Sequence, residues 1–209
     1  MLDLRGAVPP AAPAAAPAAR GLVLAESGLD AVPGWVAKLR RLEMLDLAHN
    51  RLAAVPDELA ALDRLDVLYL GDNRLLAVPA AVRAMRALRY LSVADNRIAL
   101  LPEWLGELTA LVELRLQANR IGDLPDTLTR LTALRELHLR ANRLRTVPPA
   151  IASLPRLRLL DLRANGVVTL PDELADAPAL EKLDLRWNAL TSLPAAAQRL
   201  ADRGCFVLW

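Results

Sequence analysis

Apolar residues follow one spacing pattern along most of the chain, which is clearest over Leu111–Leu131. This segment reads L-x-x-L-x-L-x-x-N-x-I-x-x-L-P-x-x-L-x-x-L. Leu114 and Leu116 are two residues apart, so a short strand would point both to one side and its other residues to the opposite side. After Pro125 the apolar spacing becomes three, which favours a helical or 3₁₀ turn. The pattern therefore predicts a unit made of a strand, a bend after Asn119 and a loosely helical return.

The chain repeats this unit at a fixed interval of 23 residues. The asparagine recurs at Asn50, Asn73, Asn96, Asn119, Asn142, Asn165 and Asn188. A proline keeps the same interval at Pro33, Pro56, Pro79, Pro102, Pro125, Pro148, Pro171 and Pro194. One unit is too small to bury its leucines, but stacked units bury them in one continuous column. A fixed period of this length predicts a solenoid.

The two recurring polar signals have separate structural roles. An asparagine amide both donates and accepts hydrogen bonds, so it suits backbone groups that are left unpaired at the bend after a strand. Proline has a backbone φ close to the helical value and lacks an N–H, so it suits the start of the return segment. We therefore interpret the asparagine column as structural.

These residues resemble the leucine-rich repeat family, in particular its 23-residue type with Leu-Pro or Val-Pro in the second half of the unit. That type is similar to Ras-pathway scaffold repeats, plant intracellular Ras-group-related repeats and many bacterial proteins. Seven full units run from Leu42 to Leu200, and an eighth begins near Ala19 with Ser27 in the asparagine position. The resemblance implies an α/β fold: a right-handed, horseshoe-shaped solenoid with one parallel concave sheet and short helical or 3₁₀ returns on the convex side.

The predicted repeat domain covers residues 19–203. Residues 1–18 have two open interpretations, a flexible Ala/Pro-rich arm or an eroded cap repeat. The second rests on two echoes of later repeats: Leu2–Arg5 resembles Leu160–Arg163, and Val8–Ala11 resembles Val147–Ala150.

Residues 204–209 are predicted to form a capping strand at the other end. A constant register places Phe206 and Leu208 in the core, and it places Cys205, Val207 and Trp209 on the outward side. Such a last strand leaves a sheet edge uncovered, so edge-strand association is an open alternative to a monomer.

The composition limits which partners and which cellular compartment we expect. The chain is 54% apolar but only 3% aromatic, as an aliphatic repeat core requires, and its net charge is +2. Nucleic acid is therefore a weakly supported partner. A single cysteine, Cys205, excludes an internal disulfide and favours the cytoplasm, with a secreted effector acting inside a host cell as the alternative. The start of the chain lacks a signal-like pattern, no stretch has transmembrane length, and the Arg- and Ala-rich composition resembles that of GC-rich bacteria.

Motifs for catalysis or metal binding are missing from the sequence. His49 and His138 are the only histidines, and four strand spacings of about 4.8 Å would separate them by roughly 19 Å. They cannot share a metal ion, and Cys205 lies too far along the solenoid to pair with either as a nucleophile. We expect no enzyme activity, no cofactor and no metal site.

The outward residues of the strands predict a polarised concave face. Its early half carries small and apolar residues with two tyrosines, and its late half is charged. Aromatic and apolar residues are enriched at interface centres, whereas charges set partner choice. The candidate partner-binding residues are Met44, Val67, Tyr69, Tyr90, Arg115, His138, Arg140, Arg163, Arg186 and Trp187.

Two columns of arginine follow from the register. Arg140, Arg163 and Arg186 would stack on the concave face, where neighbouring aspartates offer internal pairing. A second column follows the asparagines along one rim and comprises Arg51, Arg74, Arg97, Arg120 and Arg143. The favoured function is a non-enzymatic module that binds a protein through its concave face. The alternatives are the recognition part of a larger bacterial effector or enzyme, and anion or nucleic-acid binding through the arginines.

Overall fold

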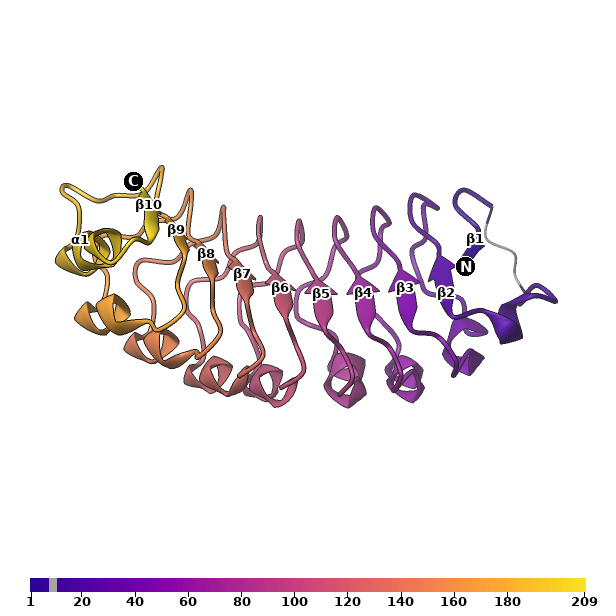
Figure 1. The fold of residues 1–209 in the computed structure, drawn as a ribbon. Coiled ribbons are helices and arrows are strands. Elements are labelled where there is room, and N and C mark those ends of the chain that lie inside the picture. The colour runs from indigo at the N-terminus through magenta and orange to yellow at the C-terminus, as the bar shows by residue number, and fades with distance from the viewer. Residues whose placement is uncertain (8–10) are drawn as a thin grey trace.

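A computed structural model describes residues 1–7 and 11–209. Its described residues form one parallel sheet of ten strands, which lie side by side in chain order (Figure 1). The strands are β1 (Leu2–Asp3), β2 (Gly21–Val23), β3 (Met44–Asp46), β4 (Val67–Tyr69), β5 (Tyr90–Ser92), β6 (Glu113–Arg115), β7 (Glu136–His138), β8 (Leu159–Asp161), β9 (Lys182–Asp184) and β10 (Phe206–Leu208).

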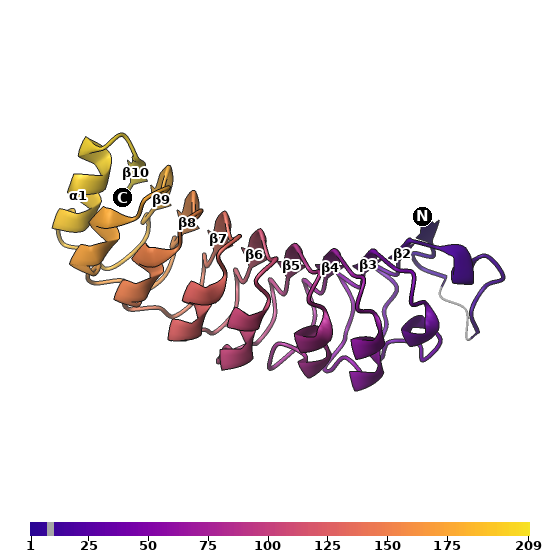
Figure 2. The ribbon, with the colours of Figure 1, turned by 60° about the horizontal axis from the view of Figure 1, so that its bottom comes forward.

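The return segments contain 3₁₀ turns, apart from the last return, which contains an α-helix. They are η1 (Ala16–Ala18), η2 (Val36–Lys38), η3 (Asp57–Ala61), η4 (Ala80–Ala84), η5 (Glu103–Glu107), η6 (Asp126–Arg130), η7 (Pro149–Ser153), η8 (Asp172–Asp176) and α1 (Ala195–Asp202). Figure 2 shows the molecule as a shallow arc, with the strands along its inner side and the 3₁₀ turns along its outer side. The predicted solenoid is confirmed.

The strand register follows the sequence period. From β2 to β9, every residue pairs with the residue 23 positions further on, as Leu45 pairs with Leu68 and Leu114 with Leu137. The middle residue of each of these strands is a buried leucine. The residue just after each strand is also buried, and it is leucine in every repeat but one, where it is Val93. The flanking residues of each strand therefore point outward and form the concave face.

Each asparagine joins neighbouring repeats through its amide. Asn119 Nδ2 donates to the carbonyl oxygens of Val93 at 2.9 Å and Leu116 at 3.0 Å, and its Oδ1 accepts from the backbone N–H of Ile98 at 2.9 Å. Asn165 and the other asparagines repeat this arrangement. The amide thus pairs backbone groups of two successive turns that the short strands leave unpaired.

The residue before each asparagine turns the chain with a positive φ. Its φ lies between 51° and 61° in all seven repeats with the asparagine, and the residue is alanine in three of them: Ala118, Ala141 and Ala164. This left-handed conformation costs a residue with a side chain on the order of 1–2 kcal/mol. Asparagine tolerates it better than alanine does, but here the asparagine is the next residue and serves as the hydrogen-bonding group.

The first strand joins the sheet with a shorter interval than the others. Leu2 pairs with Leu22, and the N–H of Leu4 donates to the carbonyl of Val23 at 2.9 Å. Ala16 in η1 is fully buried. The similarity of Leu2–Arg5 to Leu160–Arg163 thus corresponds to a strand in the structure. Most of the second similar segment, Val8–Pro10, lies outside the described residues.

The predicted register of the last strand is wrong by one residue. Phe206 pairs with Lys182 and is 60% exposed, whereas Val207 pairs with the core residue Leu183 and Cys205 is buried. The cause is the α-helix in the last return, because a helical residue advances only 1.5 Å along its axis and the return therefore needs extra chain. The interval from Lys182 to its partner Phe206 is consequently 24 residues. Phe206 and Leu208 thus occupy the outward positions of this strand, whereas a constant period predicts Cys205 and Val207 there.

The asparagine column yields a stability prediction. Replacement Asn119→Leu leaves the Val93 and Leu116 carbonyls and the Ile98 N–H without partners, so we expect it to lower the free energy of unfolding by about 1–3 kcal/mol. Asn188→Leu, near the end of the array where repeats fray, should cost less. Urea denaturation of both variants measures the difference, and equal, negligible shifts in the two midpoints would contradict the role assigned to the amides.

Gly106 provides a second stability prediction. A Cβ added to this residue of η5 would lie 2.0 Å from the backbone oxygen of Thr127 in the next return, so the two returns would have to separate. We expect Gly106→Ala to destabilise the protein by about 1–3 kcal/mol, as overpacking does. Gly122→Ala is the matched control, because a Cβ there meets nothing within 4 Å. Thermal unfolding compares the two, and equal midpoints would show that the returns separate without cost.

Candidate binding face

Two tyrosines form the centre of the early half of the concave face. The rings of Tyr69 on β4 and Tyr90 on β5 are 4.8 Å apart between centroids and tilted by 48°. Met44 and Val67 precede Tyr90 in its outward position, Tyr69 lies in the second outward position, and all four side chains are half-buried. These residues form a continuous group because three neighbouring strands present them in register.

A hollow of about 250 Å³ lies beside the tyrosines. It exists because the third outward position is a small residue in the early repeats, namely Ala48, Gly71 and Ala94. Asp72 and Asp95 lie at its border. Small residues beside aromatic rings leave room for a side chain of a partner, as interface centres do.

Arg115 on β6 links the two halves of the face. Its guanidinium lies 5.7 Å from the centroid of the Tyr90 ring, and its Nε donates to Glu113 Oε1 at 2.5 Å. Burial raises the pKa of Tyr90 to about 12, so this phenol is neutral at physiological pH and remains a hydrogen-bond donor.

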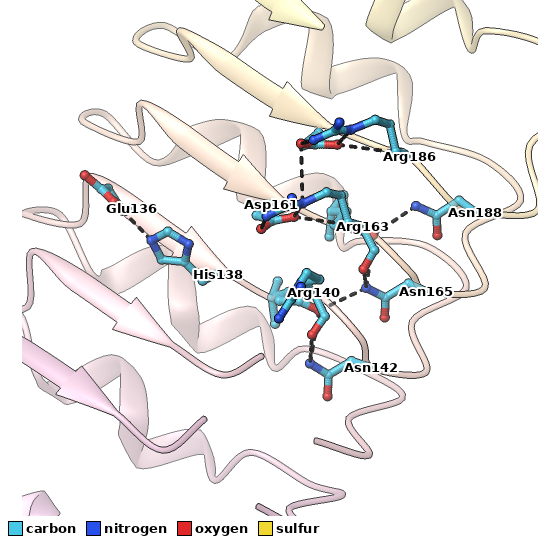
Figure 3. Close-up of polar contacts among 12 residues, drawn as sticks. Glu136, His138, Arg140, Asn142, Asp161, Arg163, Asn165, Arg186 and Asn188 are labelled. Carbon is cyan, nitrogen blue, oxygen red and sulfur yellow. Dashed lines mark hydrogen bonds and ion pairs between the residues drawn. The ribbon is translucent and has the colours of Figure 1, made fainter. Parts of the chain in front are cut away.

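His138 lies among carboxylates. Its Nε2 is 3.0 Å from Glu136 Oε2 and 3.6 Å from Glu113 Oε1 (the Glu136 contact is drawn in Figure 3). The three side chains offer ligand atoms within 4.8 Å of one another, and a histidine with two carboxylates is a ligand set that divalent metals accept. The sequence prediction of no metal site rested on the distances between the two histidines and Cys205, and it left out the carboxylates beside His138. Arg115 already pairs with Glu113, and His138 Nε2 lies within hydrogen-bonding distance of Glu136, so contacts within the protein account for the arrangement.

The late half of the face contains two buried aspartates, each paired with an arginine two residues further on. Arg163 pairs with Asp161 at 2.6 Å and reaches Asp184 at 3.4 Å, and Arg186 pairs with Asp184 at 2.8 Å (Figure 3). The internal pairing favoured by the sequence is therefore present for two of the three stacked arginines. The paired ions hold both arginines over the sheet with little freedom.

Arg140 and Trp187 differ from this network. Arg140 is exposed, and its guanidinium has no recorded ion pair or hydrogen bond within residues 1–7 and 11–209. Trp187 is 68% exposed at the turn before Asn188, and the guanidinium of Arg186 lies 5.5 Å from the centroid of the Trp187 ring. A large exposed aromatic held by a neighbouring cation is a candidate anchor for a partner.

The remaining reactive side chains are separate from one another. His49 is on the turn after β3 and pairs with Asp72 at 2.9 Å, four strands away from His138 on β7. Cys205 is buried, and burial raises the pKa of its thiol. The geometry therefore supports non-covalent recognition by the outward side chains.

The Asp161–Arg163 pair predicts a pH dependence. Burial alone would raise the pKa of Asp161, but hydrogen bonds from the side chain and backbone of Arg163 outweigh burial and hold this pKa below its ordinary value. Its contribution to stability is thus complete above the unfolded pKa of about 4 and is lost as the pH falls through the lower folded value. The stability difference between the wild type and Asp161→Asn should be constant from about pH 7 to 5 and should shrink below that. Urea midpoints across this range measure it, and a difference that grows on acidification would contradict the assignment.

Comparisons with known proteins agree with this architecture. A leucine rich repeat family model matches residues 17–75, 63–121, 109–167 and 132–190. A leucine-rich repeat protein of Leptospira interrogans superposes with a TM-score of 0.67 at 26% identity, over 90% of this chain and 60% of that one. The ectodomain of the Arabidopsis thaliana receptor kinase GASSHO1/SCHENGEN3, solved in complex with CASPARIAN STRIP INTEGRITY FACTOR 2, superposes with a TM-score of 0.74 at 31% identity.

That second match covers 90% of this chain and 24% of the receptor ectodomain, so the chain spans only part of the length of both neighbours. Comparison with curated protein sequences gave no significant match. Within the described residues, no helix is long and apolar enough to cross a membrane. The repeated match of the family model along the chain, together with the parallel sheet and its asparagine column, shows that this protein belongs to the leucine-rich repeat family.

Proposed function

We propose that this protein is a non-enzymatic interaction module that binds a protein partner through its concave face. The observation that carries the proposal is the half-buried group of Met44, Val67, Tyr69 and Tyr90 beside a hollow of the concave face. Tyrosine pairs supply a large contact area at a low cost in side-chain entropy. The fold supports this role, since leucine-rich repeats commonly serve as interaction modules.

The two halves of the face would contribute differently to binding. The tyrosine group has apolar surface still to bury, so it supplies contact energy and slows dissociation. The late half presents arginines held by Asp161 and Asp184, together with the exposed Arg140. Such preorganised charges select the partner and speed association more than they add affinity.

The structural neighbours support binding without identifying the partner. The Arabidopsis ectodomain was solved in complex with CASPARIAN STRIP INTEGRITY FACTOR 2, which shows that a chain of this fold holds another molecule. The partner of the present protein is identified by capture from lysate of its source cell followed by mass spectrometry.

A double substitution tests the proposed face. Tyr69→Ala with Tyr90→Ala should weaken binding of the captured partner by at least about 2 kcal/mol, mainly through faster dissociation, because both rings lose their contact area. Charge reversal at Arg140 and Arg163 should mainly slow association, and more so at low salt. Surface plasmon resonance separates the two rate constants.

The control must lie on the outer side of the arc and leave the core intact. Trp35 is unsuitable because it is buried in the core, so its truncation would destabilise the fold. Glu58→Ala with Arg64→Ala removes two exposed side chains in and just after η3 instead. If this control abolishes binding while the tyrosine pair has no effect, the binding face has been assigned wrongly.

A further inference from the structure

A second charged surface lies outside the concave face, along the loops that follow the asparagines. We name its five arginines the rim ladder: Arg51, Arg74, Arg97, Arg120 and Arg143. The backbone N–H of each one donates to a carbonyl of the preceding repeat, for example Arg74 to Leu52 and Arg97 to Leu75, both at 2.9 Å. The five backbones therefore stack in one register, at intervals of about 4.8 Å as for neighbouring strands.

The side chains of the rim ladder lack acidic partners within the described part of the chain. All five side chains are exposed, and none has a recorded ion pair or side-chain hydrogen bond among the residues that the structure describes. The contrast with the concave face is direct, because Arg163 and Arg186 are each held by a buried aspartate. Like charges at this spacing repel by up to about 1 kcal/mol per pair in water, and a bound polyanion relieves that repulsion.

Two large, strongly exposed apolar side chains belong to the same loops. Leu76 is 67% exposed and Leu100 is 77% exposed, and they follow Arg74 and Arg97 within two and three residues. They come from neighbouring repeats, so one partner can contact both. An exposed apolar group bordered by charge is typical of a protein interaction site.

We propose that the rim ladder, with Leu76 and Leu100, binds an amphipathic acidic helix of a protein partner. In a helix, carboxylates spaced alternately three and four residues apart recur every 4.5–6 Å or so along the axis, at about 1.5 Å per residue. That interval matches the arginine interval closely enough for flexible arginine side chains to absorb the difference. The apolar residues beside the carboxylates would meet the two leucines.

Nucleic acid fits this surface less well. Asp72, Asp95 and Asp123 are exposed in the same loops, and a phosphate backbone would bring negative charge against them at every nucleotide. A helix can place neutral residues opposite these aspartates. Binding of single strands also relies on aromatic side chains that stack on the bases, whereas Leu76 and Leu100 are aliphatic.

The probe is a fluorescein-labelled helical peptide of about 20 residues, with glutamates alternately three and four apart and leucines on the adjoining stripe. We expect saturable binding in fluorescence anisotropy that weakens steeply with salt. The same peptide with glutamine in place of glutamate should bind at least about tenfold more weakly. Equal binding of the two peptides would overturn the proposal.

Substitutions in the rim ladder test whether the peptide binds there. Arg74→Glu, Arg97→Glu and Arg120→Glu together should weaken peptide binding at least about tenfold. Arg40→Glu, Arg41→Glu and Arg64→Glu make the same change in net charge at exposed positions elsewhere and should have little effect. Leu76→Ser with Leu100→Ser should weaken binding a few-fold without changing its salt dependence.

Two further outcomes are decisive. A labelled oligothymidylate of the same length that binds more tightly than the peptide would replace the proposal with a nucleic-acid site. Tyr69→Ala with Tyr90→Ala should leave peptide binding unchanged, because those rings lie on the concave face. Peptide binding lost in the tyrosine variant but retained in the rim variant would overturn the rim site and leave the concave-face function standing.

Discussion

The structure depends on one requirement: every turn of the solenoid must satisfy its backbone polar groups at the same place. Strands of three residues leave most of the backbone outside the sheet ladder. The asparagine amide meets this requirement, because it donates to carbonyls of its own and the preceding repeat while accepting an N–H from the preceding repeat. A leucine core alone would specify burial but not this alignment, since apolar contacts have no direction.

The same requirement determines where binding chemistry can lie. The inward side chains of the strands are committed to the core, and the backbone groups are paired between repeats, so recognition is left to the outward side chains and the loops. In the late half of the concave face these side chains pair largely with one another, as Asp161 does with Arg163. The tyrosine group and the rim ladder, in contrast, retain unused apolar surface or unpaired charge.

Much of this architecture is predictable from spacing alone. The middle strands, from Met44–Asp46 to Lys182–Asp184, have the outward and inward residues that the period of 23 implies. The last strand was misassigned because a helix replaces a 3₁₀ turn before it, and an apolar pattern with a spacing of three does not distinguish the two. The pairing of Arg163 and Arg186 could also be predicted, because an aspartate stands two residues before each of them whereas a histidine stands before Arg140. Only the second contact of Arg163, with Asp184 on the next strand, depends on side-chain geometry that the sequence does not contain.

Because all the interior repeats share one register, the number of repeats can change without disturbing the packing between them. Duplication or loss of one interior unit, such as Leu111–Ala133, would keep each remaining turn in contact with an equivalent neighbour. It would move the strands after that unit relative to the tyrosines by one strand spacing, about 4.8 Å, and would leave the tyrosine group itself unchanged. The final unit differs from the others, because its helical return places the next strand 24 residues on, and a copy of it would have to keep this length. Evolution or protein engineering can therefore adjust the distance between two contact regions in discrete steps of one repeat.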